Sequence, residues 1–219
     1  ISFALVVLLG ASATFAGVQL WLTGMNGNQT VSNPANGDND VVYTNADGTT
    51  TVNKTTDAKT VALLQEVIKS PLEGEDVVVA KSYYDQTADT SIQVKSLFNY
   101  KVGETVYTRE SKGVSLKNSN NEEVSVVAAL SGKVLTVKDE VLKGTVVTIE
   151  HQNGVKTVYT GVYDVAVEAG AEIEQGDVIG KTGLSQLEPD SGNVVHFEVL
   201  KDNVKVNPET VIDKKLGDL

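Results

Sequence analysis

The sequence predicts a mainly β protein, with an antiparallel sandwich or barrel core, a short helix before it and an N-terminal transmembrane helix. Three observations lead to this fold class. Short runs of β-branched residues, separated by glycine-containing turns, recur from Asp76 onward, which is typical of antiparallel sheets. Apolar residues with helical spacing occur between Ala58 and Lys69. The stretch Ile1–Leu22 has no charged residue and is mostly apolar.

Residues 1–23 are expected to form a transmembrane anchor. A helix over Ile1–Leu22 would be about 33 Å long, enough to cross a bilayer core of roughly 30 Å. Trp21 stands where an interfacial aromatic residue is expected. A cleaved signal peptide is the alternative, because Ala11-Ser12-Ala13 fits the small-residue cleavage pattern, but the apolar run continues past that point. The sequence begins without a Met or a basic flank, so we expect further residues before it.

Residues 24–56 are rich in Asn, Gly, Thr and Asp and poor in large apolar side chains. Such a segment cannot bury enough surface to offset the entropy lost on ordering. The run Val41-Val42-Tyr43 has residue types suited to local strand pairing, but we interpret the whole segment as a flexible linker.

Residues 57–110 are expected to form an extension of one helix and several strands. Asp57 can cap a helix over Ala58–Lys69, which Pro71 would stop. A helix of about three turns is marginal alone, so its apolar face should pack on the following domain or on a partner. That face consists of Val61, Leu64, Val67 and Ile68.

The strands can be placed from the runs of β-branched residues. They are predicted at Asp76–Lys81, around Ile92–Tyr100, and at Val124–Ala129, Gly132–Val137, Thr145–Glu150, Val155–Tyr159, Val178–Ile179 and Val194–Leu200. The segment His151-Gln152-Asn153-Gly154 predicts a hairpin, because Asn-Gly accepts the backbone angles of a tight turn. Leu130-Ser131 is consistent with a hairpin or a sharp bend.

Composition excludes several kinds of function. Lys and Arg number 18 against 29 Asp and Glu, a net charge of −11, which argues against binding to a phosphate backbone. The chain has no cysteine, and therefore no disulfide and no cysteine-based metal site or nucleophile. Its two histidines, His151 and His196, are too few for a histidine-rich catalytic site.

The stretch Val165–Val199 carries the most specific pattern. Glycines supply the angles of tight turns, and β-branched residues suit half-buried strands. A six-residue unit repeats here, which relates Val167 to Ile173, Glu168 to Glu174 and Gly170 to Gly176. The stretch ends in a strand that contains His196-Phe197-Glu198.

That ending resembles the His-x-His-Phe-Glu strand of the lysostaphin-type (LytM) zinc endopeptidases, which cut peptide cross-bridges in bacterial cell walls. The resemblance runs from Ser111 to about Pro208, and the order and spacing of its motifs make it specific. It includes Ala129–Val134, the strand Val146–Glu150, Asn153-Gly154 with Thr157-Val158-Tyr159, and Val206-Asn207-Pro208. It implies a degenerate LytM-like domain over residues 111–212, with 213–219 as a tail.

The resemblance also locates the peptidase site. The first metal motif, His-x-Gly-x-Asp, matches Ser111-Lys112-Gly113-Val114-Ser115, with serine at both ligand positions. The helper histidines match Gly161 and Val194, so His196 alone remains of three ligands and two helpers. One imidazole cannot hold a catalytic zinc ion, which needs three protein ligands. We therefore predict no catalytic residue, no metal site and no cofactor.

The remaining polar candidates have structural interpretations. His196 lies within a strand and is expected to be a hydrogen-bonded structural residue, and His151 a solvated loop residue. Glu168, Glu174 and Asp177 could form a carboxylate site, but their positions at turns favour a solvated acidic rim. Ser111 and Ser115 have no plausible base among the matched positions, so a serine nucleophile is not supported.

A degenerate LytM domain behind a membrane anchor resembles the stage II sporulation protein Q family of endospore-forming bacteria. The similar features include Tyr83-Tyr84, Val141–Gly144 and Asp190–Glu198. The resemblance implies a non-catalytic protein of the forespore membrane, with its C-terminal domain in the intermembrane space. It also implies binding to a membrane protein like stage III sporulation protein AH, which would link the forespore and mother-cell membranes.

Two other functions remain open. One is a non-catalytic activator or cell-wall-binding module that serves a peptidoglycan hydrolase, with peptidoglycan itself as a ligand. The other is a lipoyl-type carrier, for which Lys181 lacks the expected flanking residues.

The interface can be sought in two places. A LytM cleft suits an extended chain, and Gly161 and Val194 should make it less polar, so we expect the cleft to serve as or border a protein-binding surface. The alternative places binding on Ala58–Lys69 or on Asp76–Tyr100.

Overall fold

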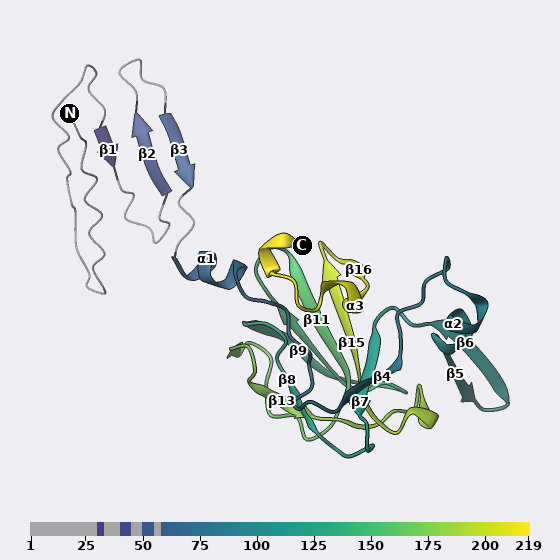
Figure 1. Cartoon of the computed structure of the whole chain (residues 1–219). Helices are drawn as coiled ribbons and strands as arrows, with labels where there is room; N and C mark the ends of the chain where they lie inside the picture. Colours follow the sequence, from purple (N-terminus) through teal and green to yellow (C-terminus); the bar gives the residue numbers. More distant parts are fainter. Residues whose placement is uncertain (1–29, 33–39, 45–49, 55–57) are drawn as a thin grey trace. The chain divides into compact units, whose positions relative to one another are not determined.

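The computed structural model describes residues 30–32, 40–44, 50–54 and 58–219 (Figure 1). The chain divides into two compact units, residues 1–58 and 59–219. The predicted anchor, residues 1–23, lies outside the described residues. Among the residues that are described, no helix is both long and apolar enough to cross a membrane.

The first unit contains a small antiparallel sheet. Strands β1 (Thr30–Ser32), β2 (Asp40–Thr44) and β3 (Thr50–Lys54) pair in the order β1-β2-β3. The run Val41–Tyr43 lies in β2, and within it Val42 and Tyr43 pair with both neighbouring strands. Local strand pairing, the alternative that the composition disfavoured, is therefore what the structure shows at these residues.

The second unit is built on a nine-stranded antiparallel sheet. Its strands follow the order β12-β9-β10-β11-β15-β7-β4, and β14 and β16 both pair with β15. Their bounds are β4 (Val77–Lys81), β7 (Val114–Asn118), β9 (Gly132–Glu140), β10 (Gly144–Glu150), β11 (Val155–Val162), β12 (Glu172–Ile173), β14 (Gly183–Leu184), β15 (Asn193–Lys201) and β16 (Val204–Val206). The antiparallel, mainly β prediction is confirmed.

Two smaller pairs of strands complete the unit. Strands β8 (Ser125–Val127) and β13 (Val178–Lys181) pair with each other, and β5 (Leu97–Val102) pairs with β6 (Thr105–Glu110) as a hairpin. The helices are short: α1 (Ala58–Leu64), α2 (Thr90–Lys95), α3 (Pro208–Val211), η1 (Pro189–Ser191) and η2 (Leu216–Asp218).

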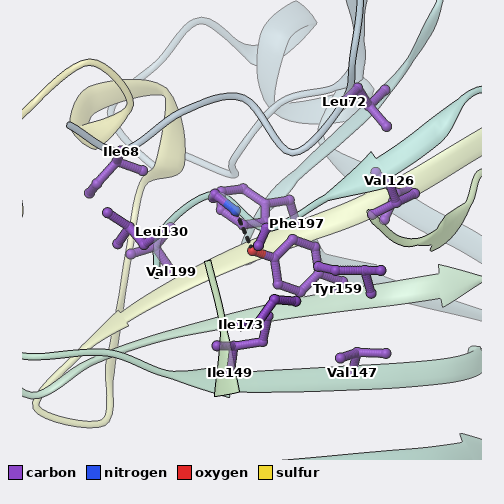
Figure 2. Close-up of a cluster of buried hydrophobic side chains, with 14 of the residues drawn as sticks. Ile68, Leu72, Val126, Leu130, Val147, Ile149, Tyr159, Ile173, Phe197 and Val199 are labelled. Carbon is purple, nitrogen blue, oxygen red and sulfur yellow. Dashed lines mark hydrogen bonds between the residues drawn. The ribbon is translucent and has the colours of Figure 1, made fainter. Parts of the chain in front are cut away.

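The core lies between the large sheet and the β8–β13 pair. Tyr159 of β11 and Phe197 of β15 are fully buried, with ring centroids 5.3 Å apart (Figure 2). Val126 and Ile179 bring the two small strands into the same cluster. Figure 2 shows Ile68 and Leu130 at another part of this cluster. Burial of these branched and aromatic side chains, at about 25 cal/mol per Å² of apolar surface, holds the two layers together.

The predicted hairpin and glycine turns are present. Strands β10 and β11 pair around residues 151–154, where Asn153 and Gly154 have φ of 58° and 65°. Gly170 and Gly176, equivalent positions of the six-residue unit, have φ of 94° and 91°. At Leu130-Ser131 the chain makes a sharp bend rather than a hairpin, because β8 pairs with β13 and β9 with β10 and β12.

Two predicted elements differ from the structure. The helix over Ala58–Lys69 ends at Leu64, because the next residues pair with the C-terminal segment: the Ile68 N–H donates to the Lys214 carbonyl at 2.9 Å. Val61 of the expected packing face is exposed, whereas Ile68 is buried in this extended conformation. The strand predicted around Ile92–Tyr100 is helix α2 followed by β5.

Candidate functional site

Backbone pairing between three neighbouring strands assembles the site. In β7 and β15, Ser115 lies opposite His196 and Val114 opposite Phe197. On the other side of β15, Thr160 of β11 lies opposite His196. The register therefore brings the Ser111–Ser115 segment to the one histidine that the motif retains.

The imidazole of His196 is buried in a hydrogen-bonded cluster. Its Nδ1 lies 3.0 Å from the Ser115 hydroxyl, which donates to Glu188 Oε1 at 2.7 Å. A hydroxyl has one proton, so both contacts are satisfied when Nδ1–H donates to Ser115 and Ser115 donates to Glu188. The other Glu188 oxygen accepts from the Ser191 hydroxyl at 2.9 Å.

The second imidazole nitrogen faces a carboxylate. His196 Nε2 lies 3.6 Å from Glu198 Oε1, which also accepts a hydrogen bond from Lys205 Nζ at 2.7 Å. Burial alone would raise the pKa of Glu198, but the neighbouring His196 ring and the hydrogen bond from Lys205 outweigh it and hold the pKa below its ordinary value. Glu198 is therefore a carboxylate that two neighbouring side chains already engage.

The β5–β6 hairpin covers this cluster. The ring of Phe98, a buried residue of β5, meets the His196 imidazole edge-on, with centroids 5.1 Å apart at 77°. Lys81 holds Phe98 in place, because its Nζ lies 5.2 Å from the ring centroid and donates to the Leu97 carbonyl at 3.0 Å. The side chain that closes the site comes from outside the LytM-like segment.

A groove of about 210 Å³ remains between the hairpin and the sheet. The hairpin contributes Phe98, Arg109 and Glu110, and the sheet contributes His196 and Glu198 among others. Lys143 and Lys205 at its border pair with Glu140 and Glu198, respectively. The groove is thus small and lined largely by charges that are already paired.

The structure supports the match to the first metal motif. A Cβ at Gly113 would lie 2.9 Å from His196 Nε2 and 2.8 Å from Glu198 Cγ, so this position requires glycine. Ser111, fully buried, donates to the Gly113 carbonyl at 2.8 Å. Neutral hydroxyls are poor zinc ligands, and these two are already used in hydrogen bonds.

The prediction that Gly161 and Val194 line an open cleft is wrong. Both residues are buried, and Val194 is only 1% exposed. Gly161 has a φ of 82°, a conformation that favours glycine. Neither residue lines the groove beside His196.

The prediction that His151 is a solvated loop residue is also wrong. His151 is buried, with Nδ1 2.9 Å from the Ser131 carbonyl and Nε2 2.8 Å from the Thr157 hydroxyl. That hydroxyl also lies 3.2 Å from the Tyr159 hydroxyl oxygen, which accepts from the Ala129 N–H at 2.9 Å. Burial raises the pKa of Tyr159 to about 12, so its hydroxyl stays protonated near neutral pH.

The other polar candidates do not come together. Glu168, Glu174 and Asp177 are exposed, as expected for a solvated rim. Lys181 is the last residue of β13 rather than the tip of a hairpin, and it pairs with Asp164 and Glu123, which contradicts the carrier alternative. Within the described residues, no group of three His, Cys, Asp or Glu is placed to hold a metal ion.

Sequence reasoning missed two residues of the cluster, Glu188 and Phe98. Glu188 lies in a loop before η1, and Phe98 is distant from the motif in the sequence. The sequence around Glu188 and Pro189 does not indicate that the glutamate is buried, since most glutamates are exposed.

Comparison with known proteins decides the family. Residues 109–208 match peptidase family M23. Stage II sporulation protein Q of Bacillus subtilis (strain 168) is 30% identical over 217 residues, covering 99% of this chain and 72% of the relative. The chain belongs to the stage II sporulation protein Q family. The resemblance seen in the sequence is confirmed.

Solved structures of the stage II sporulation protein Q family agree with this assignment. A chain in the structure of the SpoIIQ–SpoIIIAH pore-forming complex is 35% identical and has a TM-score of 0.66, covering 70% of this chain and 96% of that chain. A chain in a second SpoIIIAH–SpoIIQ complex is 37% identical with a TM-score of 0.60, covering 64% and 96%. With serine at both matched ligand positions, this member of the family lacks two of the three zinc ligands that the peptidase motif supplies.

Proposed function

We propose that this chain is a membrane-anchored sporulation protein whose LytM-like domain binds a membrane protein similar to SpoIIIAH. The domain would lie in the space between the forespore and mother-cell membranes and link them, with residues 1–23 as the forespore anchor. The observation that carries the proposal is the 35% identity, at a TM-score of 0.66, to a chain in the SpoIIQ–SpoIIIAH complex.

The site supports a binding role rather than chemistry. The position of the lost metal is filled by the Ser115–Glu188–His196 cluster and closed by Phe98. A groove of about 210 Å³ leaves little room for a peptide substrate, since pockets for small ligands usually measure about 300–1,000 Å³. The domain keeps the fold of a peptidase and binds its partner through its outer surface.

Co-purification tests the proposal. The full chain and the SpoIIIAH-like protein of the same organism are co-expressed, extracted in detergent and captured through a tag on the partner. We expect the full chain to be retained, and a catalytic M23 peptidase domain, the matched control, to be washed away. Equal retention of both, or of neither, would contradict the proposal.

A non-catalytic module serving a peptidoglycan hydrolase is the second candidate. It is favoured by the groove that persists beside His196, lined by both acidic and basic side chains. Sedimentation of the chain with purified peptidoglycan, or capture of an amidase, would support it. Retention by the SpoIIIAH-like protein with no binding to peptidoglycan would favour the first candidate.

A further inference from the structure

The turn between β10 and β11 contains a chemically labile pair of residues. In an Asn-Gly pair, the glycine nitrogen can attack the side-chain amide of the asparagine, because glycine has no side chain to obstruct it. The chain has three such pairs, at 26–27, 36–37 and 153–154, and the last lies in the part that the structure describes. Asn153 is half-buried and Gly154 is exposed, so water reaches the pair.

The surroundings of Gly154 favour this attack. No backbone acceptor is found for the Gly154 N–H among the described residues. The carbonyl of the same peptide group, that of Asn153, accepts a hydrogen bond from Lys201 Nζ. A cation at this oxygen stabilises the anion that forms when the peptide nitrogen loses its proton. The position also requires glycine, because a Cβ at residue 154 would lie 2.3 Å from Asp202 Oδ1.

The side-chain amide of Asn153 is restrained by two hydrogen bonds. Its Nδ2 donates to the carbonyls of Leu216 and Leu219, both at 3.0 Å. Attack makes the amide carbon tetrahedral, which moves Nδ2 away from both acceptors, and ammonia then carries this nitrogen away. At about 1 kcal/mol for each hydrogen bond, the two contacts should slow the reaction at least about tenfold.

The carbonyls that restrain the amide belong to the C-terminal segment, residues 213–219, which pairs with the residues that follow α1. The Leu216 N–H donates to the Glu66 carbonyl at 2.8 Å, and the Ile68 N–H donates to the Lys214 carbonyl at 2.9 Å. Leu216 and Ile68 are both fully buried. The asparagine amide thus helps to fix two segments that are distant in the sequence.

We infer that Asn153 is a site of spontaneous deamidation, that the C-terminal segment restrains the reaction, and that the reaction releases this segment. The Gly154 nitrogen forms a bond to Asn153 Cγ, the bond from Cγ to Nδ2 breaks, and ammonia leaves with the proton of the Gly154 N–H. Water then opens the cyclic imide to an aspartate or an isoaspartate. The new carboxylate has no proton to donate, so it repels the two carbonyls that the amide binds.

Deletion of residues 216–219 tests the restraint, because it removes both acceptors. The full chain and the deleted chain are incubated in detergent at mildly alkaline pH. Peptide mass spectrometry then measures the conversion of Asn153 separately from the pairs at 26–27 and 36–37. We expect conversion at least about tenfold faster in the deleted chain. Equal rates in the two chains would overturn the inference.

A second variant tests the release without the deletion. Asn153→Asp reproduces one product of the reaction, and hydrogen exchange of the Leu216 and Ile68 N–H groups reports whether the C-terminal segment has come loose. We expect exchange at least about tenfold faster than in the wild-type chain at both groups. If circular dichroism shows that the deleted chain is unfolded, this comparison decides.

Asn203→Asp is the matched control. Asn203 also has a positive φ, 64°, in the turn between two strands, but its side chain accepts a hydrogen bond from Lys156 instead of donating one. An aspartate keeps that acceptor, so the exchange of the Leu216 N–H should stay as in the wild-type chain. Unchanged exchange in Asn153→Asp, or equal acceleration in both variants, would overturn the inference.

Discussion

At the scale of single residues, Ser115 sets the chemistry of the site. The LytM resemblance implies an acidic zinc ligand at this position, whereas here a hydroxyl joins His196 to a carboxylate from a distant loop. Glu188 is 5% exposed, and a buried carboxylate is costly unless hydrogen bonds satisfy it. Ser115, Glu188 and His196 thus satisfy one another's hydrogen-bonding groups in the buried site.

Removing the Ser115 hydroxyl should destabilise the fold. Ser115→Ala leaves Glu188 Oε1 and His196 Nδ1 each without a hydrogen-bond partner in a buried position, which costs about 1–3 kcal/mol. Urea denaturation would measure the free energy of unfolding. Ser119→Ala, an exposed serine near the end of the same strand, is the control and should change it by less than about 0.5 kcal/mol. Equal effects of the two substitutions would contradict this account.

His151 should make stability depend on pH. Burial lowers the pKa of His151 below its ordinary value of 6.5, against the opposing effect of its hydrogen bond to the Ser131 carbonyl. The folded state therefore binds this proton more weakly than the unfolded state, so the contribution is complete above 6.5 and is lost as the pH falls toward the folded-state pKa.

The expected result is a lower free energy of unfolding at about pH 5.5 than at about pH 7.5, with a smaller difference in His151→Gln. Urea denaturation of both proteins at the two pH values provides the measurement. Glu198 does not interfere, since its lowered pKa affects stability only below its ordinary value of 4.5. An unchanged pH difference in the variant would show that His151 is not the titrating group.

At the scale of elements, the β5–β6 hairpin has two roles along its length. Its base places Phe98 on His196, and its outer part exposes Val102, Val106 and Tyr107. The hairpin that covers the former site thus also carries exposed apolar side chains at its outer end.

Shortening the covering side chain should uncover the histidine. Phe98→Ala removes the ring that meets His196 and should increase the reactivity of His196 toward diethyl pyrocarbonate, while that of His151, buried elsewhere, stays low. The chain has two histidines, so mass spectrometry of the modified peptides separates them. Tyr100→Ala in the same strand is the control. Equal reactivity of His196 in both variants would mean that Phe98 is not the cover.

The elements also show how far sequence reasoning reaches. Local sequence was sufficient to predict the hairpin at 151–154 and the turns at Gly170 and Gly176. Asn and Gly tolerate the positive φ angles that these turns require. The helix from Ala58 was predicted too long, because pairing of Ile68 with Lys214 is a tertiary contact that outweighs helical spacing. Burial of His151 and closure by Phe98 depend on contacts between distant segments, which periodicity does not record.

At the scale of the whole molecule, we predict that the protein binds no zinc, because serine occupies two of the three ligand positions of the M23 motif. The purified full chain, analysed for metal after gel filtration, should contain no near-stoichiometric zinc and should not cleave peptidoglycan. The reason is that one imidazole replaces a set of three ligands. Zinc bound at close to one equivalent and lost in His196→Ala would contradict the prediction.

The proposed anchor predicts the topology of the molecule. With Ile1–Leu22 in the membrane, protease added to protoplasts that expose the domain should remove the C-terminal part of the chain, and the anchor should stay in the membrane fraction. Immunoblotting of both fractions provides the measurement. A soluble product that begins near Thr14 would instead indicate cleavage after Ala11-Ser12-Ala13.

The pairing of β7 with β15 has a consequence for protein engineering. Register alone keeps positions 115 and 196 adjacent, so the scaffold retains the location of a metal centre after its ligands have gone. Rebuilding such a centre would take Ser111→His and Ser115→Asp on one strand segment. It would also require removing the Phe98 ring and the charge of Glu188, which would repel a carboxylate at position 115. The obstacle to restoring the metal centre is thus the side chains that now fill the site, not the backbone.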